Sequence, residues 1–427
     1  MSNFKIAVLS IFSVAIVVGI AIFAMSKSGG GVQSFRLTVW GTISQDAFDQ
    51  AYRASPLSKD KNAVVTYVKK DQASFDNDFV NALADGVGPD VILLREDQLY
   101  KNRNKIFPIP YASFPARTFK DTYIEGSEIF MMPEGIIGVP FSVDPLVMYW
   151  NRDIFNNNLI SEPPKYWDEV LTLTSKITHK DNSGTVTSSA VALGEWNNVT
   201  NVKGILSTMF LQAGTPIIKV DGNNIFSVLD SSLGEQVVPG QYALNYYTQF
   251  ANPNSAVYSW NRSLPSSLNM FVSGNLAIYF GYGSELFSIQ NKNPNLNFDV
   301  ASIPQIRDSA KKVTFGHIYA MSIVKQSKQV SSAFGLITSI TQPASLKAFE
   351  LSTTLPPARR DLLSSSPSDP YRAIFYSSSL LSHSWLDPDP SQSDQIFKEM
   401  IESITSGRAK VSQSLSTGSQ ELDTALK

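Results

Sequence analysis

The chain has 427 residues, of which 43% are hydrophobic and 17% are charged, a composition that argues against disorder. This length predicts two or three domains, or two lobes of one fold. A net charge of −2 leaves no basic surplus for nucleic acid, and the absence of Cys excludes disulfides, thiolate metal sites, thiol nucleophiles and a lipid-modified cysteine.

An apolar run from Ile6 to Ser26 lies between Lys5 and Lys27 and contains no charged residue. As a helix it would span about 31 Å, the thickness of a bilayer core. We therefore expect residues 1–33 to form a signal-anchor helix with a Gly/Ser spacer. This anchor would hold the rest of the chain on the extracytoplasmic face of the cell membrane. A cleaved signal peptide and a secreted protein are the alternative.

Strands and helices alternate after this spacer. The residue patterns predict strands at 35–41, 63–69 and 90–94, and helices at 46–52 and 75–83. The third strand is apolar without alternation, which is typical of a parallel strand covered on both faces. The order predicts a parallel α/β sheet, on which ligands bind beyond the carboxyl ends of the strands.

The most informative segment is residues 138–155 (GVPFSVDPLVMYWNRDIF), followed by residues 163–169 (PPKYWDE). It resembles the crossover of the extracellular solute-binding proteins of ABC importers, in the maltose-binding-protein-like, sugar-type family 1 cluster. There, G-x-P-x-x-x-D/E-x-x-x-L-x-Y-N-K-D-L/I-F precedes P-P-x-T-W-D-E. Trp150 replaces a common Tyr and Tyr166 a common Thr. Further segments resemble the family's motifs in the same order, namely 83–91, 271–279, 293–304, 315–323 and 355–359.

The resemblance implies an α/β, bilobal, periplasmic-binding-protein-like (type II) fold with a solute cleft between two lobes. Lobe one would comprise residues 34–143 plus 312–352, and lobe two residues 144–311 plus 353–427. The hinge would lie near residues 143–145, 307–313 and 351–356. The implied function is to capture a small polar solute, foremost a sugar or oligosaccharide, by closure of the lobes and to deliver it to ABC permease subunits.

Sugar binding requires aromatic faces for C–H groups and planar polar groups for hydroxyls. We expect Tyr282 to contact the solute because Gly281 and Gly283 flank it, at a turn where the family places an aromatic residue. Asp144 matches an acidic position of the family, although an Asp-Pro hinge turn would also explain it. The other candidate contacts are Trp40, Glu96, Asp97, Trp196, Trp260, Tyr319, Arg359 and Trp385.

Each of these candidates also has a purely structural interpretation. Trp40 fits a core position as well as a cleft wall, and the other three tryptophans could anchor buried loops. Glu96 or Asp97 could be a solvated acid at a helix start, and Arg359 could tie the lobes together. Trp150 and Trp167 are expected to be structural because they lie in a strand and at a helix start.

Catalytic patterns are weak. Residues 281–285 (GYGSE) match neither G-x-S-x-G nor G-x-G-x-x-G, and acid pairs such as Asp387 with Asp389 are usually solvated. Only three His occur, far apart in sequence, so we expect no metal, no cofactor and no enzyme activity. The alternatives are a glycan-processing or glycan-adhesive surface protein, or a binder of a polyamine, phosphate ester or peptide. The many aromatics favour a neutral polar solute.

Overall fold

The computed structural model describes residues 34–427 except 223, 235–236 and 310. The predicted anchor and spacer at residues 1–33 therefore lie outside the described residues. Within the described part of the chain, no helix is both long enough and apolar enough to cross a membrane.

The strands are β1 (Phe35–Gly41), β2 (Ala63–Lys69), β3 (Val91–Arg95), β4 (Met131–Met132), β5 (Gly135–Ile136), β6 (Val139–Asn151), β7 (His179–Lys180), β8 (Val186–Val191), β9 (Ile218–Asp221), β10 (Asn224–Ser227), β11 (Leu276–Tyr282), β12 (Phe298–Ala301), β13 (Thr314–Ile323) and β14 (Ser382–His383). The α-helices are α2 (Gln45–Arg53), α3 (Phe75–Ala84), α4 (Leu99–Asn102), α5 (Ala116–Thr122), α6 (Arg152–Asn157), α7 (Trp167–Ile177), α8 (Val202–Gln212), α9 (Pro239–Thr248), α10 (Ser267–Val272), α11 (Leu286–Lys292), α12 (Val330–Ile340), α13 (Pro343–Ser352), α14 (Arg360–Leu363), α15 (Pro370–Leu380), α16 (Pro390–Thr405) and α17 (Val411–Ala425). Short 3-10 helices include η2 (Glu96–Gln98), η4 (Glu125–Phe130) and η6 (Gly283–Glu285).

The predicted N-terminal alternation of strands and helices is confirmed. β1 pairs in parallel with both β2 and β3, and α2 and α3 occupy the predicted helical segments. The first four residues of β3 are buried, as its continuous apolar sequence indicates. The carboxyl ends of these strands consequently meet at one edge of the sheet, and β3 leads there directly into η2.

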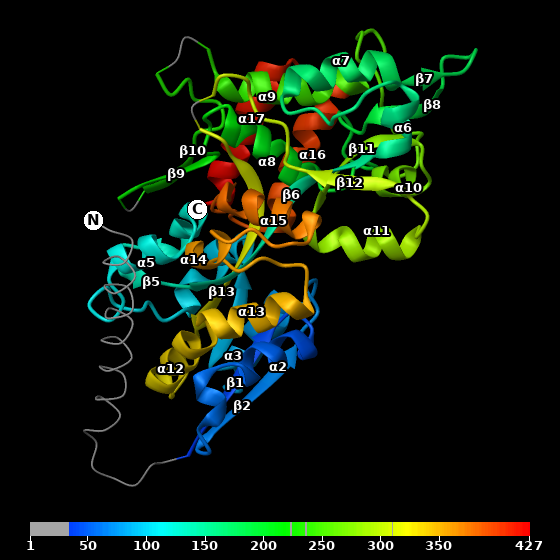
Figure 1. The fold of residues 1–427 in the computed structure, drawn as a ribbon. Coiled ribbons are helices and arrows are strands. Elements are labelled where there is room, and N and C mark those ends of the chain that lie inside the picture. The colour runs from blue at the N-terminus through cyan, green and yellow to red at the C-terminus, as the bar shows by residue number, and fades with distance from the viewer. Residues whose placement is uncertain (1–33, 223, 235–236, 310) are drawn as a thin grey trace.

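One sheet connects the two lobes of the molecule. Its strand order is β2-β1-β3-β13-β6-β11-β8-β7, with β12 also on β6 and β14 also on β13. β1–β3 with α2, α3, α12 and α13 form one lobe, and β8, β11 and β12 with α7–α9, α16 and α17 form the other (Figure 1). We call these the first and the second lobe.

β6 is the strand that both lobes share. Its first part, from Val139 to Pro145, pairs with β13, which in turn pairs with β3 of the first lobe. Its second part, from Leu146 to Asn151, pairs with β11 and β12 of the second lobe. All of β6 except Trp150 is buried, so this shared strand passes through the core of the protein.

A third connection runs beside β6. The backbone N–H of Val143 donates to the carbonyl of Pro356, and that of Ala358 donates to the carbonyl of Phe141. The chain therefore passes between the lobes along β6, along β13 and along the segment that follows α13.

Candidate functional site

A cavity of about 170 Å³ lies where the two lobes meet. Its walls come from the end of β3 and η2, the start of α8, the end of β11, β13, and the segment around the start of α16. Its lining residues are Arg95, Glu96, Asp97, Asn201, Lys203, Gly204, Tyr282, Phe315, His317, Ser384, Trp385, Asp387, Pro390 and Asp394. Two other hollows, of about 270 and 360 Å³, are lined by the second lobe alone. Of these three hollows among the described residues, only the cavity between the lobes would therefore change shape when the lobes move.

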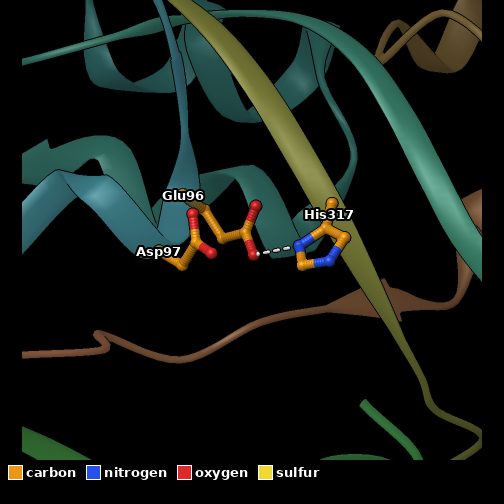
Figure 2. Close-up of side chains that lie close together, drawn as sticks. All are labelled: Glu96, Asp97 and His317. Atoms are coloured by element: carbon orange, nitrogen blue, oxygen red, sulfur yellow. Dashed lines mark hydrogen bonds and ion pairs between the residues drawn. The ribbon is translucent and has the colours of Figure 1, made fainter. Parts of the chain in front are cut away.

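Buried acids form the first-lobe wall of this cavity. Glu96 is 0% exposed, and its Oε1 lies 2.8 Å from Nδ1 of His317 while its Oε2 accepts the backbone N–H of Ile318 (Figure 2). Asp97 accepts two hydrogen bonds from the guanidinium of Arg95, one of them at 2.8 Å. Burial alone would raise the pKa of Asp97, but Arg95 outweighs that effect and holds the pKa below its usual value.

These two acids and His317 lie close enough together to be considered as metal ligands. Glu96, Asp97 and His317 offer ligand atoms that all lie within 4.8 Å of one another. However, both oxygens of Glu96 already have partners, and a fixed guanidinium occupies the carboxylate of Asp97. A permanent cation against a ligand carboxylate opposes the binding of a second cation. The donor set therefore fits an ion-pair network better than a metal centre.

The second-lobe wall is built around one ammonium group. Lys203, in the first turn of α8, places its Nζ 3.0 Å from Oδ2 of Asp387 and 2.6 Å from Oδ1 of Asp394. A cation at a helix N-terminus opposes the helix dipole, so these carboxylates must stabilise it. Burial lowers the pKa of Lys203, but the two acids outweigh burial and raise it.

The pairing with Lys203 does not satisfy the carboxylate of Asp387 completely. It is 2% exposed, its Oδ2 also accepts the Ser393 hydroxyl at 2.7 Å, and its Oδ1 has no hydrogen-bond partner among the described residues. Burial raises the pKa of Asp387 to about 6, although Lys203 opposes the shift. The two carboxylates therefore raise the pKa of Lys203, whereas burial raises the pKa of Asp387 against the opposing effect of Lys203.

Aromatic rings complete the cavity. The ring of Tyr282 lies over that of His317, with centroids 4.6 Å apart and an interplanar angle of 31°. Trp385 stacks on Phe397 at 5.8 Å, and its indole N–H donates to the hydroxyl of Ser207 at 3.0 Å. These contacts fix the rings in place, so they offer preformed apolar faces beside the charged groups.

Further contacts connect the lobes outside the cavity. Nζ of Lys101, in α4 of the first lobe, lies 2.7 Å from Oδ2 of Asp389, the N-cap residue of α16. The Tyr100 hydroxyl donates to the carbonyl of Leu426 near the C-terminus. These contacts, like the cavity, join the first lobe to the second.

Four of the ten residues that the sequence analysis selected line the cavity: Glu96, Asp97, Tyr282 and Trp385. Asp144 and Tyr319 lie beside it but are not part of the lining. Asp144 pairs in register with His317, and its Oδ1 accepts the backbone N–H of Ser284 at 2.9 Å. Burial raises the pKa of Asp144 above its usual value.

The structure places the other four selected residues away from the lining. Trp40 packs in the first-lobe core with Nζ of Lys70 3.9 Å from its ring centroid. Trp196 is half-buried against the hydrophobic core. Trp260 is 0% exposed. Arg359 makes a two-point ion pair with its neighbour Asp361.

Arg95, Asn201, Lys203 and Asp387 also line the cavity but were not among the predicted site residues. Two of them carried a usable signal. Lys203 is the only charged residue in α8, a helix that is buried along nearly all of its length. Asn201 precedes α8 in the left-handed conformation, with φ of 62°, which Asn tolerates better than most residues. Arg95 ends β3 at the predicted ligand-binding edge of the sheet, and Asp387, which was expected to be a solvated acid, is instead buried because α16 and Lys203 pack against it.

Comparisons with known proteins agree on the fold. The model of the family described as bacterial extracellular solute-binding protein matches residues 53–373. Among solved structures, a cyclo/maltodextrin-binding protein with maltotetraose is 16% identical, with a TM-score of 0.75 over 94% of this chain and 99% of that one. A cyclic alpha-maltosyl-1,6-maltose binding protein from Arthrobacter globiformis is 15% identical, with a TM-score of 0.76 over 92% and 99%.

A third solved structure is an ABC transporter solute-binding protein from Thermotoga lettingae bound with alpha-D-tagatose. It is 18% identical, with a TM-score of 0.65 over 92% of this chain and 100% of that one. No curated protein matches the sequence. At these identities, the solved structures establish the fold and leave the solute open.

Proposed function

Because the chain belongs to the bacterial extracellular solute-binding proteins, we propose that it captures a sugar in the cavity between its lobes. As a member of that family it is a solute-binding component of an ABC importer and not an enzyme. Closure of the lobes around the solute would produce the form that the ABC permease subunits recognise.

The observation that carries this proposal is that both lobes contribute to one cavity with mixed polar and aromatic walls. Glu96 and Asp97 come from the first lobe, and Lys203 and Tyr282 come from the second. A solute that contacts both walls stabilises the closed form over the open one, because the open form separates these contacts. Carboxylates and a neighbouring aromatic ring also suit the hydroxyls and C–H faces of a sugar.

The size of the cavity favours a small sugar. Its volume of about 170 Å³ is smaller than the roughly 300–1,000 Å³ of typical pockets for drug-sized ligands. We therefore propose a monosaccharide or disaccharide, with Asp144 and Tyr319 within reach of its edge. The sugar-binding solved structures support the class of solute and do not specify its length.

We also propose the arrangement of the chain around this site. Lobe one would comprise residues 34–143 plus 312–352, and lobe two residues 144–311 plus 353–427. The apolar run between Lys5 and Lys27 supports attachment to the extracytoplasmic face of the cell membrane.

Thermal unfolding with a panel of monosaccharides, disaccharides, amino acids and polyamines tests the proposed function. A solute at 100 times its Kd should stabilise the folded protein by ~2.7 kcal/mol, which raises the unfolding midpoint measurably. We expect a sugar to do so, and Tyr282→Ala to abolish the shift. Tyr242→Ala is the matched control, because Tyr242 lines the hollow of about 270 Å³ in the second lobe. Shifts with amino acids or polyamines alone would refute the sugar, and loss of the shift in the Tyr242 variant would refute the site.

A further inference from the structure

We propose that Glu285 is a positioning residue of the solute site, because its carboxylate holds two cavity-lining residues, Asn201 and Tyr282, at a fixed spacing. This inference rests on the proposed function, since it identifies a residue that controls solute affinity in the same cavity. Glu285 is the last residue of η6 and is half-buried, but it is not itself one of the residues that line the cavity. It would therefore act on the solute through the residues that it holds.

Donors from two different elements occupy both oxygens of the Glu285 carboxylate. Oε1 accepts the backbone N–H of Tyr282 at 2.9 Å and the side-chain N–H₂ of Asn201 at 2.6 Å. Oε2 accepts the hydroxyl of Tyr279 at 2.5 Å. Tyr282 ends β11, whereas Asn201 is the N-cap residue of α8. One carboxylate consequently joins the end of a strand to the start of a helix that lies 84 positions earlier in the chain.

The hydrogen bond to Asn201 fixes the start of α8. Asn201 has a left-handed backbone conformation, with φ of 62°, and its side chain does not cap its own helix. Such a conformation persists in a residue other than glycine where the surrounding contacts hold it. The side-chain amide of Asn201 donates instead to Glu285. The first turn of α8 then supplies Lys203 and Gly204 to the wall of the cavity.

The ring of Tyr282 depends on this spacing between β11 and α8. A Cβ on Gly204 would lie 2.4 Å from the Tyr282 hydroxyl, so the ring reaches the backbone of α8 with no room to spare. The same ring packs on His317, with centroids 4.6 Å apart. Binding groups must be held to within about 0.5 Å of their productive geometry. A small displacement of α8 or of the Tyr282 backbone would therefore weaken the contact with the solute.

Titration calorimetry at pH 7 with D-glucose, D-galactose, D-tagatose, maltose and trehalose tests this assignment, and the sugar that the wild type binds most tightly is the probe for the variants. Glu285→Ala should bind it roughly 10-fold or more weakly, because three donors lose their shared acceptor. In Glu285→Gln, the amide oxygen can still accept from Tyr282 and Asn201, and the N–H₂ group can donate to the Tyr279 hydroxyl. This conservative variant should keep the affinity within about 3-fold of the wild type.

Glu169→Ala is the matched control. Glu169 closes the capping box of α7 as Glu285 closes that of η6, and it accepts the backbone N–H groups of Lys165 and Tyr166. It does not line the cavity between the lobes. Its replacement should lower the free energy of unfolding, measured with urea, and leave the affinity unchanged.

A second variant tests the same contact if Glu285→Ala does not fold. Tyr279→Phe removes one donor to the Glu285 carboxylate, and Tyr279 also lies outside the cavity lining. It should weaken binding of the same sugar by about 3-fold.

Full affinity in Glu285→Ala, or in Tyr279→Phe where it replaces that variant, would overturn the inference and leave the proposed function standing. A loss in Glu285→Gln as large as that in Glu285→Ala would also overturn it, because the charge and not the position of the acceptor would then decide affinity. An equal loss in Glu169→Ala would overturn it as well, since any lost cap would then weaken binding. If no sugar of the panel binds the wild type, the proposed function fails and the inference fails with it.

Discussion

Replacement of Asp387 by Asn should stabilise the protein at neutral pH in the absence of solute. Burial raises the pKa of this carboxyl from 3.8 to about 6. At ~1.4 kcal/mol per pKa unit, the ionised form of Asp387 costs the folded state ~3 kcal/mol. The Asn side chain avoids this cost because it is uncharged and can keep the hydrogen bonds with Lys203 and Ser393.

The sign of this stability difference follows from the way the free energy of unfolding of the wild type depends on pH. Because the folded state binds the proton of Asp387 more tightly than the unfolded state, the contribution of Asp387 is favourable below about pH 4. It is lost as pH rises through about 6. The free energy of unfolding of Asp387→Asn minus that of the wild type should therefore grow over this range and then level off at ~3 kcal/mol.

Urea unfolding of both proteins at pH 4.5, 5.5, 6.5 and 7.5 measures this difference. Asp389→Asn is the matched control. The ion pair with Lys101 and backbone hydrogen bonds outweigh partial burial, so the pKa of Asp389 lies below its usual value. Its replacement should mildly destabilise the protein at neutral pH, an effect that fades on acidification. A loss of stability in Asp387→Asn at pH 7.5 would refute the reasoning, because it would mean that the Lys203 pair outweighs the cost of burial.

Three further predictions concern closure, the cavity wall and the ion-pair network. Lys101→Ala removes a half-exposed contact between the lobes, so affinity for the solute should fall by up to about 5-fold at low salt and less at high salt, measured by calorimetry. Unchanged affinity at low salt would show that the ion pair between Lys101 and Asp389 does not contribute to solute binding. Gly204→Ala should weaken binding at least 10-fold, because its Cβ would lie 2.4 Å from the Tyr282 hydroxyl; full affinity would show that the ring moves freely. Removal of divalent metal with EDTA should leave the affinity unchanged, and a loss that calcium or zinc restores would identify a metal site.

Local patterns in the sequence were sufficient to predict the first-lobe sheet. The apolar residues of β3 alternate with neither polar residues nor turns, and the helical spacing of Phe75 and Phe79 places both on the buried face of α3. The order of these elements implies a parallel sheet. From that sheet it follows that Glu96 and Asp97 lie at a ligand-binding edge.

The second-lobe wall could not be predicted in the same way. Lys203 and Asp387 are 184 positions apart, at a helix start and in a proline-rich loop, and neither local sequence indicates its partner. Trp260 shows the opposite problem. Its local sequence indicates a loop, but the fold buries the ring and pairs its N–H with Asn198. Contacts between distant segments, which no local pattern encodes, decided all three positions.

The most direct test of the account measures whether the sugar closes the lobes. Because the chain has no Cys, the double variant Gln50→Cys and Ser288→Cys would carry two spin labels at exposed positions only, one on α2 and one on α11. Pulsed electron resonance then reports the distance between the lobes with and without the sugar found in the panel. We predict that the sugar shortens and narrows the distribution of distances, and that Tyr282→Ala abolishes the change. Tight binding of the sugar with an unchanged distribution would contradict a site formed by closure of the two lobes.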